Sequence, residues 1–218
     1  SVTDPGPDGV AGNVDDGIPI AAFNLAPEYL SLPVVNFYDN VPGDTNYYTW
    51  ETTGTKRMSD RWSMLASFSK TWSAAQNNTF FGTAFRQNQL PVTPNDLINT
   101  EPDGQINYTD WSLKLHGTYE GPFGLKLSPM LRHQGGQNFG RTILATLNYG
   151  SVRLAAEPLE TRRQDNITVF DFRLEKVIQL TQTLRVGPFM DLYNALNANP
   201  EQNITWSSGS LFLRPTNI

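Results

Sequence analysis

A strict alternation of apolar and small polar side chains over eleven residues constrains this chain more than any other feature. From Trp62 to Trp72, one side carries Trp62, Met64, Ala66, Phe68, Lys70 and Trp72, and the other carries Ser63, Leu65, Ser67, Ser69 and Thr71. Successive strand residues point to opposite faces, so the pattern predicts a strand with one apolar and one polar face. Ten steps of about 3.3 Å, tilted by about 40°, rise roughly 25 Å, the height of the apolar band of a membrane-spanning β-barrel.

Four further long segments show the same alternation. They cover residues 108–119, 123–132, 170–178 and 184–193. Strands of soluble proteins usually run about 5 to 6 residues, so these lengths favour a barrel wall over a soluble β-sandwich, whose strands also alternate. We therefore predict an all-β fold: an antiparallel up-and-down sheet of long hairpins, forming a segment of an outer-membrane β-barrel with long extracellular loops.

The alternation also predicts which side chains share a face. On the apolar face we expect lipid contacts from Trp62, Phe68, Trp72, Trp111 and Phe172. On the polar face we expect side chains that line a wet lumen: Lys114, His116, Asp171, Arg173, Glu175, Arg185 and Asp191. The charges on this second face alternate in sign along the segments, so cross-strand ion pairs are the simplest role for most of them.

Short and long connections alternate along the chain. Tight turns are predicted at residues 58–61, 120–122 and 181–183, as on the periplasmic side of a barrel. Residues 75–104 and 134–166 predict long extracellular loops, with short local strands at Arg141–Tyr149 and Leu211–Leu213. The predicted organisation is an Asp/Gly/Pro-rich extracellular loop region at 1–45, followed by barrel-wall hairpins within 46–218, at about 46–74, 105–134 and 167–197.

Composition excludes several classes of protein. The mean hydropathy of −0.40 and the lack of any apolar run near the ~20 residues of a spanning helix argue against a helical membrane protein. A net charge of −5 without a basic stripe argues against nucleic acid as a partner. The chain has no cysteine, which excludes disulfides, thiolate metal sites and a cysteine nucleophile.

No enzyme motif stands out, and we expect no catalytic residue. A Gly-x-Ser-x-Gly elbow, a His-Glu-x-x-His pair and a phosphate-binding glycine loop are all missing. The two histidines, His116 and His133, fall on opposite faces of the predicted strands, which argues against a shared metal site or triad. A hydrolase on a β-scaffold stays a minor alternative.

The acidic segment at residues 4–17 is the best candidate for a metal site. Carboxylates alternate there with glycines, and tight turns could bring hard oxygens around Ca²⁺, although the spacing does not match an EF-hand. The candidate calcium ligands are Asp4, Asp8, Asn13, Asp15 and Asp16. A solvated acidic turn without metal is the alternative interpretation.

Aromatic residues in the predicted loops suggest ligand contacts. The candidates are Phe81, Phe85, Phe139, Tyr149 and Trp206, together with Phe80 and Phe212. Exposed aromatics beside Asn and Gln commonly bind sugars, peptides or chelates. The equally simple alternative is that large loops fold over themselves and bury these rings.

Several phrases resemble the barrel hairpins of TonB-dependent outer-membrane receptors, in particular the Oar-like group. Residues 48–68 contain the phrase T-x-x-K-R-x-S-x-R-W, residues 115–125 resemble the next hairpin, and residues 191–199 resemble a late D-x-x-N-x-x-N strand end. The closing residues 213–218 resemble the loop before the last strand. The resemblance implies the C-terminal part of a barrel, without its plug domain, energy-coupling box or final strand.

This resemblance implies uptake of a ligand such as a siderophore, saccharide or peptide across the bacterial outer membrane, with this chain supplying wall and extracellular loops. The implied partners are the remaining barrel strands, the plug and outer-membrane lipid. An open sheet could also pair with copies of itself through its edges. A soluble, secreted β-sandwich binding module and a self-assembling β-fragment are the alternatives.

Overall fold

The computed structural model describes residues 1–33, 35, 46–76, 93–101 and 105–217. Within these residues the fold is all-β and antiparallel, as predicted. Its helical segments are four short 3₁₀ turns, η1 (Pro27–Tyr29), η2 (Pro94–Leu97), η3 (Pro122–Gly124) and η4 (Leu159–Thr161). None of the described helices is long and apolar enough to cross a membrane.

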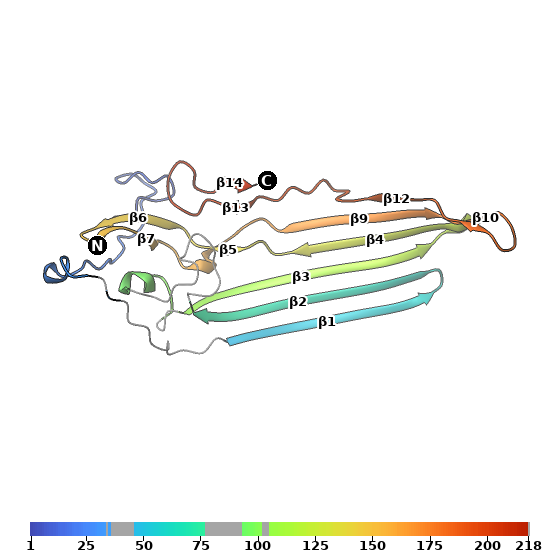
Figure 1. Ribbon diagram of the computed structural model, residues 1–218, viewed down its shortest axis with the longest axis horizontal. Coiled ribbons are helices and arrows are strands. Elements are labelled where there is room, and N and C mark those ends of the chain that lie inside the picture. Colours follow the sequence, from blue (N-terminus) through green and yellow to red (C-terminus); the bar gives the residue numbers. More distant parts are fainter. Residues whose placement is uncertain (34, 36–45, 77–92, 102–104, 218) are drawn as a thin grey trace.

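One open sheet of six strands dominates the structure (Figure 1). Its order is β1-β2-β3-β4-β9-β12. The strands are β1 (Asn46–Ser59), β2 (Trp62–Gln76), β3 (Gln105–Glu120), β4 (Leu125–Gln134), β9 (Ile167–Lys176) and β12 (Phe189–Leu192). All neighbours pair antiparallel, and β1 and β12 form the two edges, so this sheet does not close on itself.

A tight turn joins the two strands of each of the first two hairpins, and both turns lie at the same end of this sheet. Between β1 and β2, Asp60 and Arg61 both adopt positive φ, of 51° and 70°, as a two-residue type I′ turn requires. Between β3 and β4, η3 ends at Gly124, whose φ is 76° and where an added Cβ would lie 2.5 Å from the carbonyl oxygen of Val177. The first two hairpins therefore match the predicted ranges closely.

The third hairpin differs from the prediction. The expected long strand over 184–193 is divided into β11 (Arg185–Val186) and β12, because Gly187 and Pro188 interrupt it and proline has no backbone N–H to donate to a ladder. The strand β11 pairs with β10 (Ile178–Gln179) in a separate tip at the turn end (Figure 1). The predicted lumen residue Arg185 thus lies outside the six-stranded sheet.

The opposite end of the sheet carries a folded cap, defined here as residues 1–33, 93–101, 135–166 and 198–217 (Figure 1). Its strands form three small sheets: β5 (Asn138–Phe139) with β8 (Arg162–Arg163), β6 (Thr142–Leu147) with β7 (Gly150–Ala155), and β13 (Gln202–Ile204) with β14 (Pro215–Asn217). The strand predicted over Arg141–Tyr149 is confirmed as β6, whereas Leu211–Leu213 forms turns.

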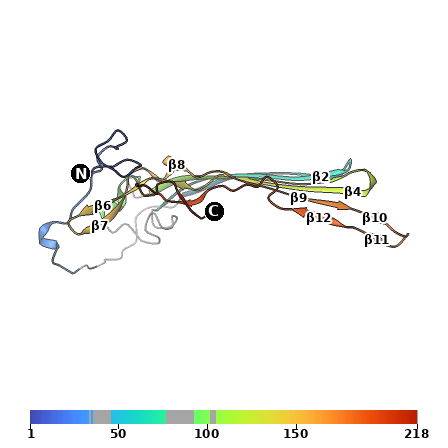
Figure 2. The same cartoon turned by 90° about the horizontal axis from the view of Figure 1, so that it is seen from above.

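The buried core lies in the cap and at the adjoining sheet end. One apolar cluster joins Ile106, Tyr108, Phe139, Leu159 and Trp206, and the other joins Ile20, Ile143, Ala145, Val152 and Leu154. From the level of Trp72 and Thr109 to the turns, by contrast, no described residue of the long sheet is buried. Figure 2 shows this part as a single layer.

Candidate functional site

The apolar face of the long sheet carries two rows of aromatic side chains. Residues paired directly across antiparallel strands share a face, so the register places Trp50 beside Lys70 and Trp111, with Tyr48 beside Trp72 one step further toward the cap. These four aromatics form the cap-side row, and Trp62 with its partner Tyr119 forms the turn-side row. From Trp62 to Trp72 the strand β2 takes ten residue steps, which corresponds to about 33 Å along the strand.

Between the two rows this face is apolar except for Thr52, Lys56, His133 and Thr168. The described strands contribute Met64, Ala66, Phe68, Leu113, Leu115, Leu127, Pro129, Leu131, Phe170, Phe172 and Leu174. The lysines of this face reach the rows with their charged ends: Lys70 Nζ is 4.9 Å from the centre of the Trp72 ring, and Lys56, which pairs with Met64, places its Nζ 4.0 Å from the centre of the Trp62 ring. Long cationic side chains at such levels reach the polar boundary of a membrane while their stems stay in the apolar layer.

The other face of the sheet is polar and charged. It carries Lys114, His116, Asp171, Arg173, Glu175 and Asp191, six of the seven predicted lumen residues. Arg173 donates two hydrogen bonds to Asp191, of 2.7 and 2.8 Å, which is the expected cross-strand ion pair. The five residues predicted to face lipid all lie on the apolar face, and their contact with lipid stays a prediction.

His133 lies on the apolar face, opposite to His116, as the alternation predicts. Its ring contacts that of Trp111 edge-on, with 4.9 Å between the ring centres, and its Nδ1 is 2.7 Å from Thr168 Oγ1. It therefore sits beside the cap-side row with its polar edge satisfied.

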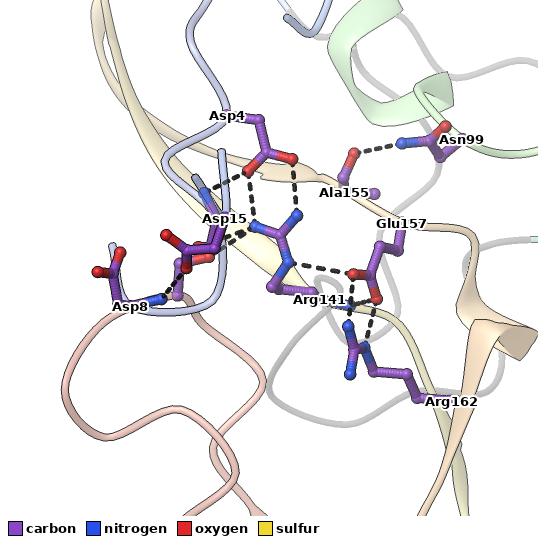
Figure 3. A network of polar contacts seen from close by, with 10 residues as sticks. Asp4, Asp8, Asp15, Asn99, Arg141, Ala155, Glu157 and Arg162 are labelled. Carbon is purple, nitrogen blue, oxygen red and sulfur yellow. Dashed lines mark hydrogen bonds and ion pairs between the residues drawn. The ribbon is translucent and has the colours of Figure 1, made fainter. Parts of the chain in front are cut away.

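A buried ion network ties the cap together around Arg141 (Figure 3). The Arg141 guanidinium donates to both oxygens of Asp4 at 2.6 Å and, through Nε, to Glu157 at 3.1 Å. The side chains of Arg141 and Asp4 are only 5% and 4% exposed. Arg162 completes the network with bonds of 2.6 and 2.9 Å to the two Glu157 oxygens. These contacts fasten the N-terminal segment to the loop between β4 and β9.

The backbone is shaped for this network. Gly17 packs so closely on Asp4 that an added Cβ would lie 1.9 Å from Oδ2. Arg141 Nη1 also donates to the carbonyl oxygen of Gly6 at 3.1 Å and to Ser208 Oγ at 2.9 Å, so one guanidinium binds three segments, at residues 4–6, 157 and 208. A cavity lined by Asp4, Arg141, Glu157 and apolar residues of 18–23 and 94–98 opens beside it.

Glu157 makes the stability of the cap depend on pH. Burial opposes its ionisation, but hydrogen bonds from Arg162 and Arg141 outweigh this, so the pKa of Glu157 lies below its ordinary value of 4.5. A lowered carboxyl pKa contributes stability that is present above the ordinary value and lost as pH falls through the lowered one.

Thermal unfolding of the cap, followed from pH 7 to pH 3, should therefore show a falling melting temperature below about pH 4.5. The Glu157→Gln variant should melt lower at pH 7 and show a shallower further fall. Parallel curves for the two proteins would contradict a role for the ionised Glu157 carboxylate.

The five predicted calcium ligands are not brought together. Asp4 is committed to Arg141, and the other four are used within the turn: Asp8 accepts from Val10 N and Asn13 Nδ2, Asn13 from Asp15 N, Asp15 from Asp8 N and Asp16 from Gly12 N. No group of three or more His, Asp or Glu side chains in the described part of the chain could hold a metal ion. Backbone N–H groups bind one oxygen each of Asp8, Asp15 and Asp16, whereas Asp16 Oδ1 has no hydrogen-bond partner in the described part of the chain. Calcium binding by this turn stays a prediction.

The aromatic residues predicted to bind a ligand lie in different environments. Phe139 and Trp206 stack with 5.8 Å between ring centres and are 2% and 7% exposed, so they belong to the core of the cap. Tyr149 is partly exposed, and its hydroxyl accepts a hydrogen bond from Asn95. The Phe212 ring contacts the Arg162 guanidinium, whose Cζ is 5.4 Å from the ring centre. Phe80, Phe81 and Phe85 lie outside the described residues.

Sequence reasoning missed the residues that organise the cap. Arg141, Glu157 and Arg162 carry no motif, and Asp4 is 137 positions from Arg141. Asn95, which is buried and binds both the N–H and the carbonyl of Phe23, was missed too. The one available signal was the position of Arg141 directly before an apolar segment predicted as a strand.

No family model, curated protein or solved structure matches this chain. The fold and the geometry therefore carry the functional proposal.

Proposed function

We propose that the long sheet forms part of the wall of an outer-membrane β-barrel and that the cap forms its extracellular loops. One observation carries the proposal: a largely apolar band, bounded by two aromatic rows, that no described residue of the protein covers. The separation of the rows, tilted as barrel strands are, spans roughly 25 Å of height, which fits the apolar band of such barrels. Tight turns at one end and a large folded cap at the other match the asymmetry of these barrels.

The function that we infer is uptake of a ligand in the manner of a TonB-dependent receptor, supported by the resemblance of residues 48–68 and 191–199 to its hairpins. The cap would capture the ligand, which could be a siderophore, a saccharide or a peptide. The open edges at β1 and β12 would pair with further barrel strands, or with copies of this chain, since unpaired backbone groups are costly in lipid. A plug inside the barrel would face the charged side of the sheet.

A soluble, secreted binding module is the second candidate. The observation that favours it is the core of the cap, which is built from two apolar clusters and the Arg141 network independently of the sheet's apolar face. This alternative requires the apolar band to be covered by protein instead of lipid.

Tryptophan fluorescence in vesicles distinguishes these candidates. Trp50, Trp62, Trp72 and Trp111 lie on the apolar face, whereas Trp206 lies in the cap. With the full chain reconstituted in phosphatidylcholine vesicles, lipids brominated near the headgroup should quench most of the emission, and lipids brominated near the chain ends should quench less. This order is expected because both rows lie near the membrane boundaries.

The Trp206→Phe variant should leave the quenched part of the emission unchanged and lose only emission that the brominated lipids do not reach. Emission that brominated lipids do not affect, together with a monodisperse 24.4 kDa species in buffer without detergent, would refute the barrel proposal and support the soluble module.

A further inference from the structure

The apolar face of the long sheet contains a hollow beside the turn-side row. Its volume is about 350 Å³, within the range of about 300 to 1,000 Å³ that is common for ligand-binding cavities. Most of the residues that line it belong to this face, among them Trp62, Met64, Gly117, Tyr119, Leu131 and Phe170. Trp62, Met64 and Tyr119 are 39%, 39% and 49% exposed, so their side chains are accessible to a molecule that enters the hollow.

Gly117 accounts for the hollow. Its neighbours on the same face of β3 are Leu115 and Tyr119, so a position without a side chain lies between two large ones. Among the described residues, and apart from its chain neighbours, only two heavy atoms lie within 4 Å of an added Cβ: the carbonyl oxygen of Ser63 at 3.3 Å and Cγ of Pro129 at 3.8 Å. The missing side chain therefore leaves a depression in the apolar band.

The hollow extends along the strands. It begins at the level of Tyr119 and Trp62 and reaches Leu115, four residue steps along β3, or roughly 13 Å. The acyl chain of a phospholipid has the same direction in a membrane, from the boundary at the headgroup toward the middle of the bilayer. With the sheet placed in a membrane as proposed above, the hollow has the position and direction of a single acyl chain.

Lys56 places a positive charge at the mouth of the hollow. Its Nζ is 4.0 Å from the centre of the Trp62 ring, and its hydrogen bonds, of 2.7 to 3.5 Å, go to carbonyl and hydroxyl oxygens of residues 57–62. These oxygens are neutral, so they hold the ammonium group in place without compensating its charge. The turn at 57–61 adds two arginines against a single aspartate. A ligand with a negatively charged group at this level is therefore favoured.

We propose that the hollow binds one acyl chain of an acidic phospholipid, with the phosphate of the lipid beside Lys56. The chain takes the place of the side chain that Gly117 lacks, and it covers aromatic and aliphatic groups that are otherwise exposed. The lysine attracts the headgroup by charge, and each Lys or Arg near an anionic membrane surface favours binding by about fivefold. The site rests on the proposed function, because it requires that the sheet lie in a membrane, and it adds a specific lipid to it.

Trp62 reports on this site because it lines the hollow. The full chain with Trp50→Phe, Trp72→Phe, Trp111→Phe and Trp206→Phe is reconstituted in phosphatidylcholine vesicles that contain phosphatidylglycerol as a minor lipid. One of the two lipids at a time is brominated on its acyl chains, and quenching of the Trp62 emission gives the ratio of their binding constants. We expect phosphatidylglycerol to be favoured about fivefold.

Two variants of this protein test the two parts of the site, each with a matched control. Gly117→Leu fills the hollow and should abolish the preference, whereas Gly117→Ala, which adds the same Cβ but leaves the rest of the hollow open, should retain it. Lys56→Gln should lower the ratio about fivefold, to near one. Its control is Lys126→Gln, which removes a charge at the same end of the sheet but from the polar face, and which should leave the ratio unchanged.

A ratio near one in the parent, or an unchanged ratio in Gly117→Leu, would overturn the lipid site while leaving the sheet in the membrane. Trp62 emission that neither lipid quenches, in vesicles where the other tryptophans of the parent chain are quenched, would assign the hollow to a second copy of the chain that shields it. Failure of the proposed membrane location has a different signature, because none of the tryptophans on the apolar face would then be quenched.

Discussion

Replacing Arg141 with methionine should lower the free energy of unfolding of the cap by about 3–5 kcal/mol. The change leaves Asp4 as a buried carboxylate without its guanidinium, with only the Gly6 N–H on Oδ1, while Glu157 retains Arg162. It also leaves acceptors on Gly6 and Ser208 unpaired. Chemical denaturation followed by near-ultraviolet circular dichroism, which reports the stacked Phe139 and Trp206, measures the loss.

A control in the hairpin of β6 and β7 distinguishes loss of the ion network from a general effect of losing an arginine. Arg153 is exposed on β7, and Arg153→Met should change stability by no more than about 0.5 kcal/mol. The double variant Asp4→Leu with Arg141→Met should be less destabilised than the Arg141→Met protein, because the orphaned charge is gone. A double variant as unstable as the sum of the two single changes would show that the pair does not interact.

The long sheet was predictable because its signal is local. A side-chain period of two assigns each residue to a face without knowledge of its neighbours, and the hairpin turns then fix the register. The two faces of β2 and β3 and the opposite placement of His116 and His133 followed from that period, and the turn residues at 58–61 and 120–122 located the tight ends of the first two hairpins. In the third hairpin, the alternation continued through Gly187 and Pro188, and the prediction gave the period more weight than the missing N–H of proline.

The cap was not predictable because its contacts are distant in sequence. The acidic turn carries the composition of a calcium loop, and nothing near Asp4 indicates that an arginine at position 141 binds both of its oxygens. Phe139 and Trp206 stack across 67 positions, and local sequence cannot distinguish a buried ring from one that binds a ligand.

The apolar band predicts a large loss of stability in vesicles when a charge replaces Phe68. This residue lies midway between the two aromatic rows, with its ring 5.8 Å from that of Trp50 and its backbone paired with Leu113. If the band meets lipid, Phe68→Arg places a charge near the middle of the bilayer, and the free energy of folding into vesicles should become less favourable by about 2–4 kcal/mol. Urea titration of the vesicle-bound protein, followed by tryptophan emission, gives this value.

The adjacent position on the strand supplies the control. Ser69 points to the opposite face, where Glu51 is its direct neighbour on β1, so Ser69→Arg adds the same charge beside a carboxylate on the side that we assign to water. Its loss should stay below about 1 kcal/mol, because only the hydrogen bond to Ser112 is removed. Equal losses for the two variants would mean that the faces do not differ in environment, and the lipid assignment would fail. Phe68 and Ser69 are successive residues of one strand and differ in the face that they occupy. A large loss for Phe68→Arg beside a small loss for Ser69→Arg is therefore expected only if lipid lies on one side of the sheet.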